Sequence, residues 1–205
     1  MDTKYIAQAT KDLRQDPKMR HVIEIVGELS PIRLTKDPFQ KLSRSIVGQQ
    51  LSVKAAASIY ARLLDEVAGG NTKLLPEDVL RTDSEDLRGV GLSYQKASYL
   101  HNLAEHVINH NLHARSFTRH TNEEVIEALT AIKGIGRWTV EMYLMFGLGR
   151  PDVLPVDDLG IKKGFQKVYR LRTLPDREKM HTLARSWNGH YTVGSLYLWR
   201  SLDNE

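Results

Sequence analysis

The 205-residue sequence contains no cysteine, and this absence removes several kinds of chemistry at once. Disulfides, a cysteine nucleophile, thiolate zinc sites and cysteine-ligated iron–sulfur clusters are excluded, so any reaction must use oxygen, nitrogen or backbone groups. Long apolar runs are also missing, since no stretch of about 18 apolar residues occurs, and the N-terminal segment is polar rather than signal-like. We therefore expect an intracellular protein, cytoplasmic (nucleoid-associated in a bacterium) or nuclear, that is neither secreted nor inserted in a membrane.

Acidic residues are absent from one segment of the chain. Between residues 159 and 175 there are five basic side chains and no acidic one, a local charge of +5. Because the whole chain carries only +4, all other residues together sum to −1. Three of the basic side chains follow helical spacing, Lys163, Lys167 and Arg170. They predict either a phosphate-contacting helix face or an ordinary solvated one.

Sustained strand-like alternation of apolar and polar residues is also missing, and apolar residues recur instead at helical spacing. The sequence predicts an all-α fold of about ten short helices without a flexible linker. Asp37 before Pro38 predicts one helix start, and Thr121 with Glu124 predicts a capping box at another. Glycine-rich breaks between helices are expected at 69–71, 89–91, 134–136 and 147–155.

Two of these breaks share one frame, apolar-basic-Gly-apolar-Gly. They are residues 87–91 (LRGVG) and 132–136 (IKGIG), and each precedes an expected helix. Two copies do not make a repeat architecture. Either copy can be an ordinary connection between helices, but the second also has features of a ligand site.

The second frame lies within residues 129–147, which we expect to form a helix, a tight turn and a second helix. Gly134 and Gly136 permit positive φ and close approach to the main chain, while the N–H groups and dipole of the second helix attract an anion. The turn therefore predicts a site for one DNA phosphate. Carbonyl oxygens of Thr130, Ile132 and Ile135 are candidate ligands for a structural Na⁺ or K⁺ beside it, and no other cofactor is expected.

Four segments together resemble one protein family. Residues 132–139 (IKGIGRWT) are similar to the helix-hairpin-helix element of the base-excision DNA glycosylases, and residues 154–162 (LPVDDLGIK) to the loop that ends in their catalytic aspartate. Residues 46–56 (IVGQQLSVKAA) and 91–97 (GLSYQKA) resemble the branch specialised for alkylated purines, the 3-methyladenine DNA glycosylases. The resemblance covers roughly residues 39 to 200.

The resemblance implies that Asp158 is the catalytic aspartate. Hydrolysis of an N-glycosidic bond passes through an oxocarbenium-like sugar, which an ionised carboxylate stabilises while it orients or deprotonates a water molecule. Asp158 stands directly before an expected helix, with Asp157 as its neighbour in the substrate pocket. Either aspartate can instead be a helix N-cap, and for Asp158 the two roles are compatible.

Trp138 occupies the place at which strand-cleaving members of the superfamily carry a Schiff-base lysine. The resemblance therefore implies a monofunctional enzyme, which uses water and stops at an abasic site. An aromatic face also attracts the positive charge of an alkylated purine, by about 0.5 to 2 kcal/mol, so Trp138 is a candidate pocket wall. A tryptophan in a helix more often belongs to the core.

A flipped nucleotide leaves a gap in the duplex that the protein must fill. By resemblance, Gln50 is the first choice for this plug and Leu51 the second, although a polar turn between helices would carry similar residues. The candidate DNA-binding residues as a set are Gln50, Leu51, Ser52, Lys54, Gly134, Ile135, Gly136, Arg137, Thr139, Lys163 and Lys167.

The C-terminal segment keeps only part of the pattern of these relatives, which is Trp-x-Pro-x-Arg-Ser followed by a closing Tyr-Leu-Trp-Arg helix. Trp187 and residues 197–200 fit, whereas positions 189, 191 and 192 carry glycine, tyrosine and threonine. His190 and Tyr191 are candidates to stack on the flipped base, or they simply pack at a helix start.

These features predict a single two-lobed unit, with one lobe at about residues 38–147, the other at about 1–37 plus 148–205, and the active site in the cleft between them. The expected protein is a monomeric DNA glycosylase that removes 3-methyladenine- or 7-methylguanine-type purines from double-stranded DNA. Two alternatives stay open. One is a helix-hairpin-helix DNA-binding module without catalysis, in which Asp158 is only a cap, and the other is a glycosylase for deaminated purines such as hypoxanthine.

Overall fold

The computed structural model describes residues 1–34, 37–110, 112 and 114–203, and within these ranges it consists of helices and loops without a strand. The predicted all-α fold is confirmed. This part of the chain has twelve α-helices and four short 3₁₀ or π segments, more than the ten or so expected, because short helices such as α5 (Pro76–Arg81) and α6 (Ser84–Gly89) span only six residues each. None of its helices is long and apolar enough to cross a membrane.

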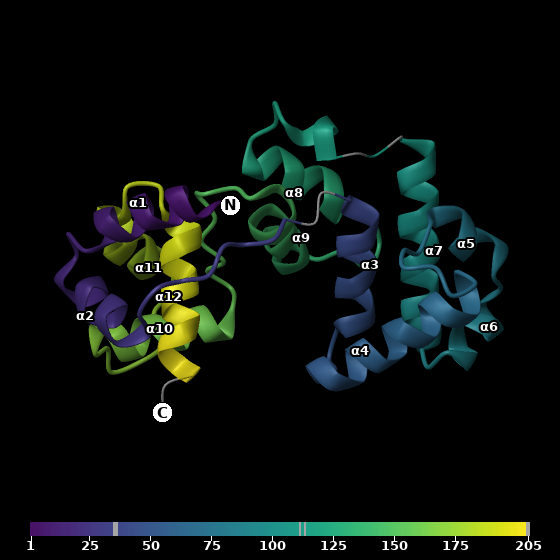
Figure 1. Ribbon diagram of the computed structural model, residues 1–205, viewed down its shortest axis with the longest axis horizontal. Coiled ribbons are helices and arrows are strands. Elements are labelled where there is room, and N and C mark those ends of the chain that lie inside the picture. Colours follow the sequence, from purple (N-terminus) through teal and green to yellow (C-terminus); the bar gives the residue numbers. More distant parts are fainter. Residues whose placement is uncertain (35–36, 111, 113, 204–205) are drawn as a thin grey trace. The chain divides into compact units, whose positions relative to one another are not determined.

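The chain divides into two compact units, coloured along the sequence in Figure 1. Unit 1 comprises Met1–Leu34 and Leu144–Glu205, and unit 2 comprises Thr35–Tyr143. The sequence-based prediction placed the boundaries at 37/38 and 147/148, a few residues later.

Unit 1 packs its helices around one aromatic core. Trp187 is fully buried and stacks on Phe165, with ring centroids 5.3 Å apart and planes within 3°. Gly194 lies in α12 (Tyr191–Asp203), and a Cβ added to it would lie 2.4 Å from the Trp187 ring. A glycine is therefore required where α12 approaches the core. The elements of this unit are α1 (Thr3–Leu13), α2 (Pro17–Val26), a π segment (Leu144–Leu148), α10 (Leu159–Tyr169), α11 (Arg177–Leu183), a 3₁₀ turn (Ala184–Trp187) and α12 (Tyr191–Asp203).

Unit 2 is organised around its longest helix, α7 (Tyr94–Asn109), which packs against α3 (Pro38–Gly48) and α5. Leu42 and Ile46 of α3 and Leu100 and Leu103 of α7 are fully buried. The other elements are α3 (Pro38–Gly48), α4 (Val53–Arg62), a π segment (Leu63–Val67), α5 (Pro76–Arg81), α6 (Ser84–Gly89), a 3₁₀ turn (Ala114–Phe117), α8 (Asn122–Thr130) and α9 (Arg137–Tyr143).

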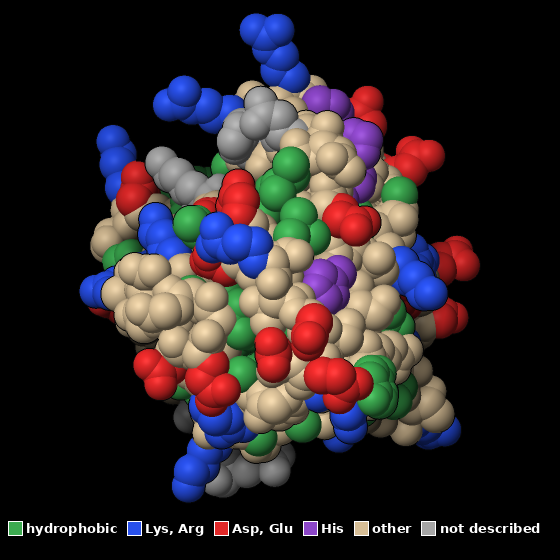
Figure 2. All heavy atoms as spheres, turned by 90° about the vertical axis from the view of Figure 1, so that its right-hand side faces the viewer, with side chains coloured by type: hydrophobic (Ala, Val, Ile, Leu, Met, Phe, Trp, Pro, Cys, Tyr) green, Lys and Arg blue, Asp and Glu red, His purple; other side chains and the backbone are tan. Residues whose placement is uncertain are grey.

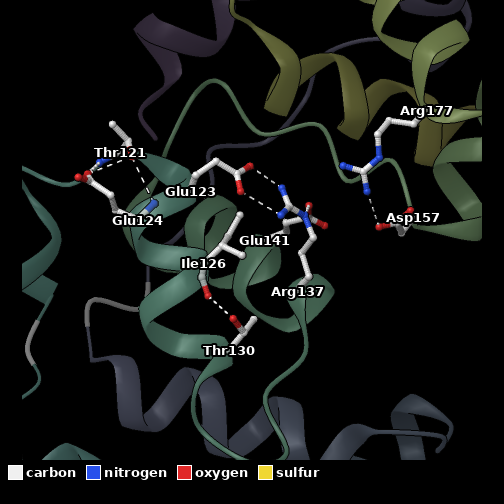
Figure 3. A network of polar contacts seen from close by, with 9 residues as sticks. All are labelled: Thr121, Glu123, Glu124, Ile126, Thr130, Arg137, Glu141, Asp157 and Arg177. Carbon is white, nitrogen blue, oxygen red and sulfur yellow. Dashed lines mark hydrogen bonds and ion pairs between the residues drawn. The ribbon is translucent and has the colours of Figure 1, made fainter.

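Both predicted helix starts in unit 2 are confirmed. Asp37 accepts a hydrogen bond from the Gln40 amide, with Pro38 at the first helical position of α3. Thr121 and Glu124 form the expected capping box at the start of α8, visible in Figure 3. Each reciprocal bond satisfies an N–H group that the first turn of a helix otherwise leaves unpaired.

Candidate active site

Asp158 is the N-cap of α10. Its Oδ1 atom accepts hydrogen bonds from the Ile161 amide at 2.8 Å and from the indole Nε1 of Trp199 at 2.9 Å. The predicted capping role is confirmed, while the predicted catalytic role stays a prediction. Two N–H donors therefore fix the position of this carboxylate oxygen at the start of the helix.

Trp199 reaches Asp158 because residue 160 is glycine. A Cβ at Gly160 would lie 2.9 Å from the indole ring and 3.0 Å from Asp158 Oδ1, so any side chain there would push the two apart. On its other side the Trp199 ring stacks with Phe146, at 6.4 Å between centroids. Sequence reasoning identified Trp199 only as part of a C-terminal pattern and missed this contact. The glycine two residues after the aspartate was the one available signal.

The Asp157 carboxylate has a different partner from the Asp158 carboxylate. Its carboxylate pairs with Arg177 of α11 at 3.0 Å, and both side chains are more than half exposed (Figure 3). An exposed pair of this kind contributes little to stability, about 0.2–1 kcal/mol. The structure thus gives the two neighbouring aspartates different partners, and the expected place of Asp157 in a substrate pocket stays a prediction.

His190 has both ring nitrogens engaged within unit 1. Nδ1 lies 2.7 Å from the Tyr5 hydroxyl and Nε2 lies 3.1 Å from the Asp12 carboxylate. Hydrogen bonds from Gln8 and then from His190 lower the pKa of Asp12, so the carboxylate favours its ionised form. Tyr191 packs near the core ring of Trp187, at 6.4 Å. Both contacts are structural ones, and stacking of either residue on a flipped base stays a prediction.

Thr192 forms hydrogen bonds with the segment that leads to Asp158. Its hydroxyl donates to the Arg150 carbonyl at 2.7 Å and accepts from the Val153 amide at 3.3 Å. The serine of the relatives' pattern is replaced here, but a hydroxyl is retained, so the replacement preserves the hydrogen-bonding chemistry of this position.

The basic residues of α10 have mixed environments. Lys163 and Lys167 are both exposed. Lys167 also donates a hydrogen bond from Nζ to the Ser201 carbonyl at 2.8 Å. Arg170 ends the helix in a left-handed conformation with φ of 55°. Part of the predicted basic stripe therefore also binds α12, and its role as a DNA contact stays a prediction.

In unit 2, Trp138 is not a core residue, because 46% of it is exposed on α9. The neighbouring Thr139 is only 4% exposed, so its side chain belongs to the packed face of α9, and its expected DNA contact stays a prediction. Helical geometry explains the difference, since adjacent residues on a helix point about 100° apart.

Arg137 is held by two carboxylates. Figure 3 shows its guanidinium between Glu123 of α8 and Glu141 of α9, with ion pairs of 2.5 Å and 3.1 Å. These hydrogen bonds and charges, chiefly those of Glu123, raise the pKa of Arg137. Its charge is compensated inside the hairpin, so the side chain joins α8 to α9, and a DNA contact from this residue would have to compete with Glu123.

The hairpin turn is shaped by Gly134, which has φ of +100° and lies against Tyr99. A Cβ at this position would fall 2.2 Å from the tyrosine ring, so only glycine fits. Ile132 and Ile135 are buried and anchor the turn, and the Ile132 carbonyl accepts the Ile135 amide at 3.0 Å. A carbonyl oxygen that accepts one hydrogen bond keeps a second lone pair. Binding of Na⁺ or K⁺ by the main-chain oxygens of Thr130, Ile132 and Ile135 stays a prediction.

The predicted plug loop lies between α3 and α4. Gln50 is exposed and has a left-handed backbone, with φ of 57°, and Leu51 is 40% exposed. Ser52 caps α4 by accepting the Ala55 amide at 3.3 Å, and Lys54 is exposed in its first turn. Both plug candidates therefore present side chains to solvent, although insertion into DNA is untested.

Comparison with known proteins places this geometry in a family. A model of HhH-GPD superfamily base excision DNA repair proteins matches residues 43–189. DNA-3-methyladenine glycosylase 1 of Schizosaccharomyces pombe is 37% identical over 191 residues, which are 91% of this chain and 82% of that protein.

Two solved structures are similar over nearly the whole chain. The 3-methyladenine DNA glycosylase of S. pombe in complex with abasic DNA has a TM-score of 0.83 at 35% identity, covering 94% of this chain and 95% of that one. A DNA-3-methyladenine glycosidase from Bacillus halodurans has a TM-score of 0.82 at 40% identity, covering 93% and 87%. With its hairpin, its capped aspartate and these matches, the chain belongs to the HhH-GPD superfamily of base excision DNA repair proteins.

Proposed function

We propose that this protein is a monofunctional DNA glycosylase that flips alkylated purines of the 3-methyladenine and 7-methylguanine type out of double-stranded DNA and hydrolyses their N-glycosidic bond. The observation that carries the proposal is the Asp158 carboxylate, fixed by the Ile161 amide and the Trp199 indole at the start of α10. DNA-3-methyladenine glycosylase 1 of S. pombe matches over 91% of the chain.

The chemistry requires little of the protein, because an alkylated purine is already a good leaving group. As the bond from C1′ to the purine breaks, its electron pair neutralises the positive charge of the base. The Asp158 carboxylate stabilises the developing positive charge on the sugar and orients a water. The water oxygen bonds to C1′ and its proton passes to Asp158 or to solvent.

Trp138 supports hydrolysis without strand cleavage. The indole has no amine that could attack C1′, and it stands at the place where strand-cleaving relatives carry lysine. Its exposed ring also offers a π-face to a cationic base. A neutral base such as hypoxanthine lacks this attraction, so we expect it to be released more slowly.

One face of unit 2 is unsuited to DNA. Between residues 65 and 86 the chain has seven acidic and two basic side chains, and carboxylates gather on the face shown in Figure 2. These charges repel phosphate. We infer that DNA approaches the side of unit 2 that carries the hairpin and the plug loop, with a Na⁺ or K⁺ at the hairpin carbonyls and a single protein chain acting as a monomer.

The decisive experiment compares the wild type with Asp158→Asn on duplex DNA containing 7-methylguanine. We expect the wild type to release the base and leave DNA that breaks only after alkali treatment. Asp158→Asn should release it at least about 100-fold more slowly while binding DNA comparably, and Trp199→Phe, which removes one donor, should slow release less.

Each other outcome has a clear meaning. A wild type that binds DNA but releases no base would indicate a non-catalytic DNA-binding module. An Asp158→Asn variant of full activity would exclude Asp158 as the catalytic group, and strand breakage without alkali would contradict the monofunctional assignment. A matched duplex containing hypoxanthine tests the preference for a cationic base.

A further inference from the structure

Lys96 of α7 makes two hydrogen bonds to the end of another helix. Its ammonium donates to the Val47 carbonyl at 2.8 Å and to the Gln49 carbonyl at 2.7 Å. Both carbonyls lie at the C-terminal end of α3, where the last turn leaves acceptors without partners and the helix dipole is negative. A cation is therefore suited to this place, and Lys96 closes the helix immediately before the plug loop.

The next residue along the chain has an unfavourable backbone. Gln50 follows Gln49 directly and has φ of 57°, in the left-handed region that is unfavourable for a non-glycine residue. Such a conformation persists only when its surroundings impose it. Lys96 fixes the carbonyl that precedes Gln50, and the Leu51 amide donates to Gly48 on the other side at 3.2 Å.

The same loop is joined to the hairpin. The Gln49 side chain donates to the Gly134 carbonyl at 3.1 Å. Gly134 in turn lies against Tyr99, which is three residues after Lys96 and thus on the same side of α7. Tyr99 is itself held by a hydrogen bond from Gln95 to its hydroxyl, at 2.6 Å. One short stretch of α7 therefore contacts both the plug loop and the phosphate-binding turn.

The Lys96 amine is partly withdrawn from water to make these contacts. Burial lowers its pKa, so hydration lost by the ammonium is only partly offset by its two carbonyl partners. An exposed lysine such as Lys73 has no comparable constraint, and it provides a matched control for the loss of one positive charge in unit 2.

We propose that Lys96 is a positioning residue that holds the plug loop, residues 48–52, in register with the hairpin turn, residues 132–136. The inference rests on the proposed function, since the position of the loop affects the reaction only if the loop enters DNA. With the two segments held together, Gln50 keeps a fixed distance from the phosphate bound at the hairpin turn. The side chain can then fill the gap left by the flipped base without a rearrangement of the loop. Displacement of such a group by about 1 Å can cost 100-fold in rate.

The test is a double-mutant cycle of Lys96→Met and Gln50→Ala, read as the single-turnover rate of 7-methylguanine release. Lys96→Met alone should slow release by about 10- to 100-fold. In the Gln50→Ala background, Lys96→Met should slow base release by a further factor of about two at most, because the side chain that Lys96 positions has already been removed. Lys73→Met should stay within about twofold of the wild type, and Lys96→Arg, which keeps two donors, should restore part of the rate.

If the two substitutions instead multiply, Lys96 acts independently of the plug and the proposal is wrong. A second readout does not depend on catalysis. Hydrogen exchange at the Leu51 amide should accelerate at least about tenfold in Lys96→Met while exchange in the core of α7 is unchanged. Unchanged exchange at Leu51 would overturn the proposal, whereas faster exchange in a protein that releases no base would support it and refute only the glycosylase assignment.

Discussion

The two glycine segments of unit 2 share a sequence frame but form different turns. In residues 87–91 the helix α6 continues through Gly89, and the positive φ of +104° falls on the second glycine, Gly91. In residues 132–136 the preceding helix has already ended at Thr130, and the positive φ of +100° falls on the first glycine, Gly134.

Side chains contact both turns, and in the second one Gln49 donates to the Gly134 carbonyl at 3.1 Å. The two turns differ in how the next helix starts. Arg62 donates to the Val90 carbonyl at 2.9 Å, and Ser93 caps α7 by accepting the Lys96 amide at 3.2 Å. Before α9 stands Gly136, which has no side chain with which to cap the helix. A similar frame therefore forms two different turns, depending on where the helices end. In the sealed turn, residues 87–91, a side chain caps the following helix, whereas in the open turn, residues 132–136, the following helix begins after a glycine.

The largest difference is expected between alanine substitutions of the two glycines with positive φ. Gly134→Ala should cost about 2–5 kcal/mol in unfolding free energy, because left-handed strain adds to a clash with the rigid Tyr99 ring. Gly91→Ala should cost only about 1–2 kcal/mol, since its nearest neighbour is the flexible end of Arg62. Urea unfolding measures both, and equal losses would contradict the distinct packing of the two turns.

Removal of the cap from the sealed turn should affect stability alone. Ser93→Ala leaves an N–H group of α7 unpaired and should cost about 1 kcal/mol. DNA affinity, measured by fluorescence anisotropy with a duplex containing an abasic analogue, should not change. Ser93→Asn keeps a capping oxygen and should retain most of the stability; a loss of DNA affinity in Ser93→Ala would mean that this turn also binds phosphate.

The smallest effect tests the open turn. Gly136→Ser has room, since no atom lies within 4 Å of the added Cβ, and its hydroxyl can cap α9. We expect a few tenths of a kcal/mol of added stability but about threefold weaker DNA binding, because the hydroxyl competes with a phosphate for the same N–H groups. Gly89→Ser is the matched control at the sealed turn, and equal weakening by both variants would refute the comparison.

Local features of the fold were predictable from sequence. The Asp37 and Thr121 caps and the capping position of Asp158 all rest on hydrogen bonds that span three residues. Such bonds depend only on residue type and spacing, so motif reasoning finds them. The hairpin glycines were identified for the same reason, although the frame shared with residues 87–91 did not reveal which glycine would take positive φ.

The contacts that orient the candidate site were not predictable. Trp199 meets Asp158 across 41 residues, and Lys96 meets Val47 across 49. Arg137 pairs with Glu123 across 14 residues, a partner that the sequence did not reveal. No pattern of spacing encodes such partners, because they depend on how helices pack and on which gaps glycines leave open.

The sequence by itself determined the helical character of this chain, its capped helix starts, the hairpin and the place of Asp158 before α10, since each arises from bonds within one turn of backbone. Tertiary structure alone decided that Trp138 is exposed while Thr139 is buried, and that Trp199 and Lys96 support the aspartate and the plug loop. These outcomes depend on close packing between distant segments, in which the volume left by one residue fixes the position of another.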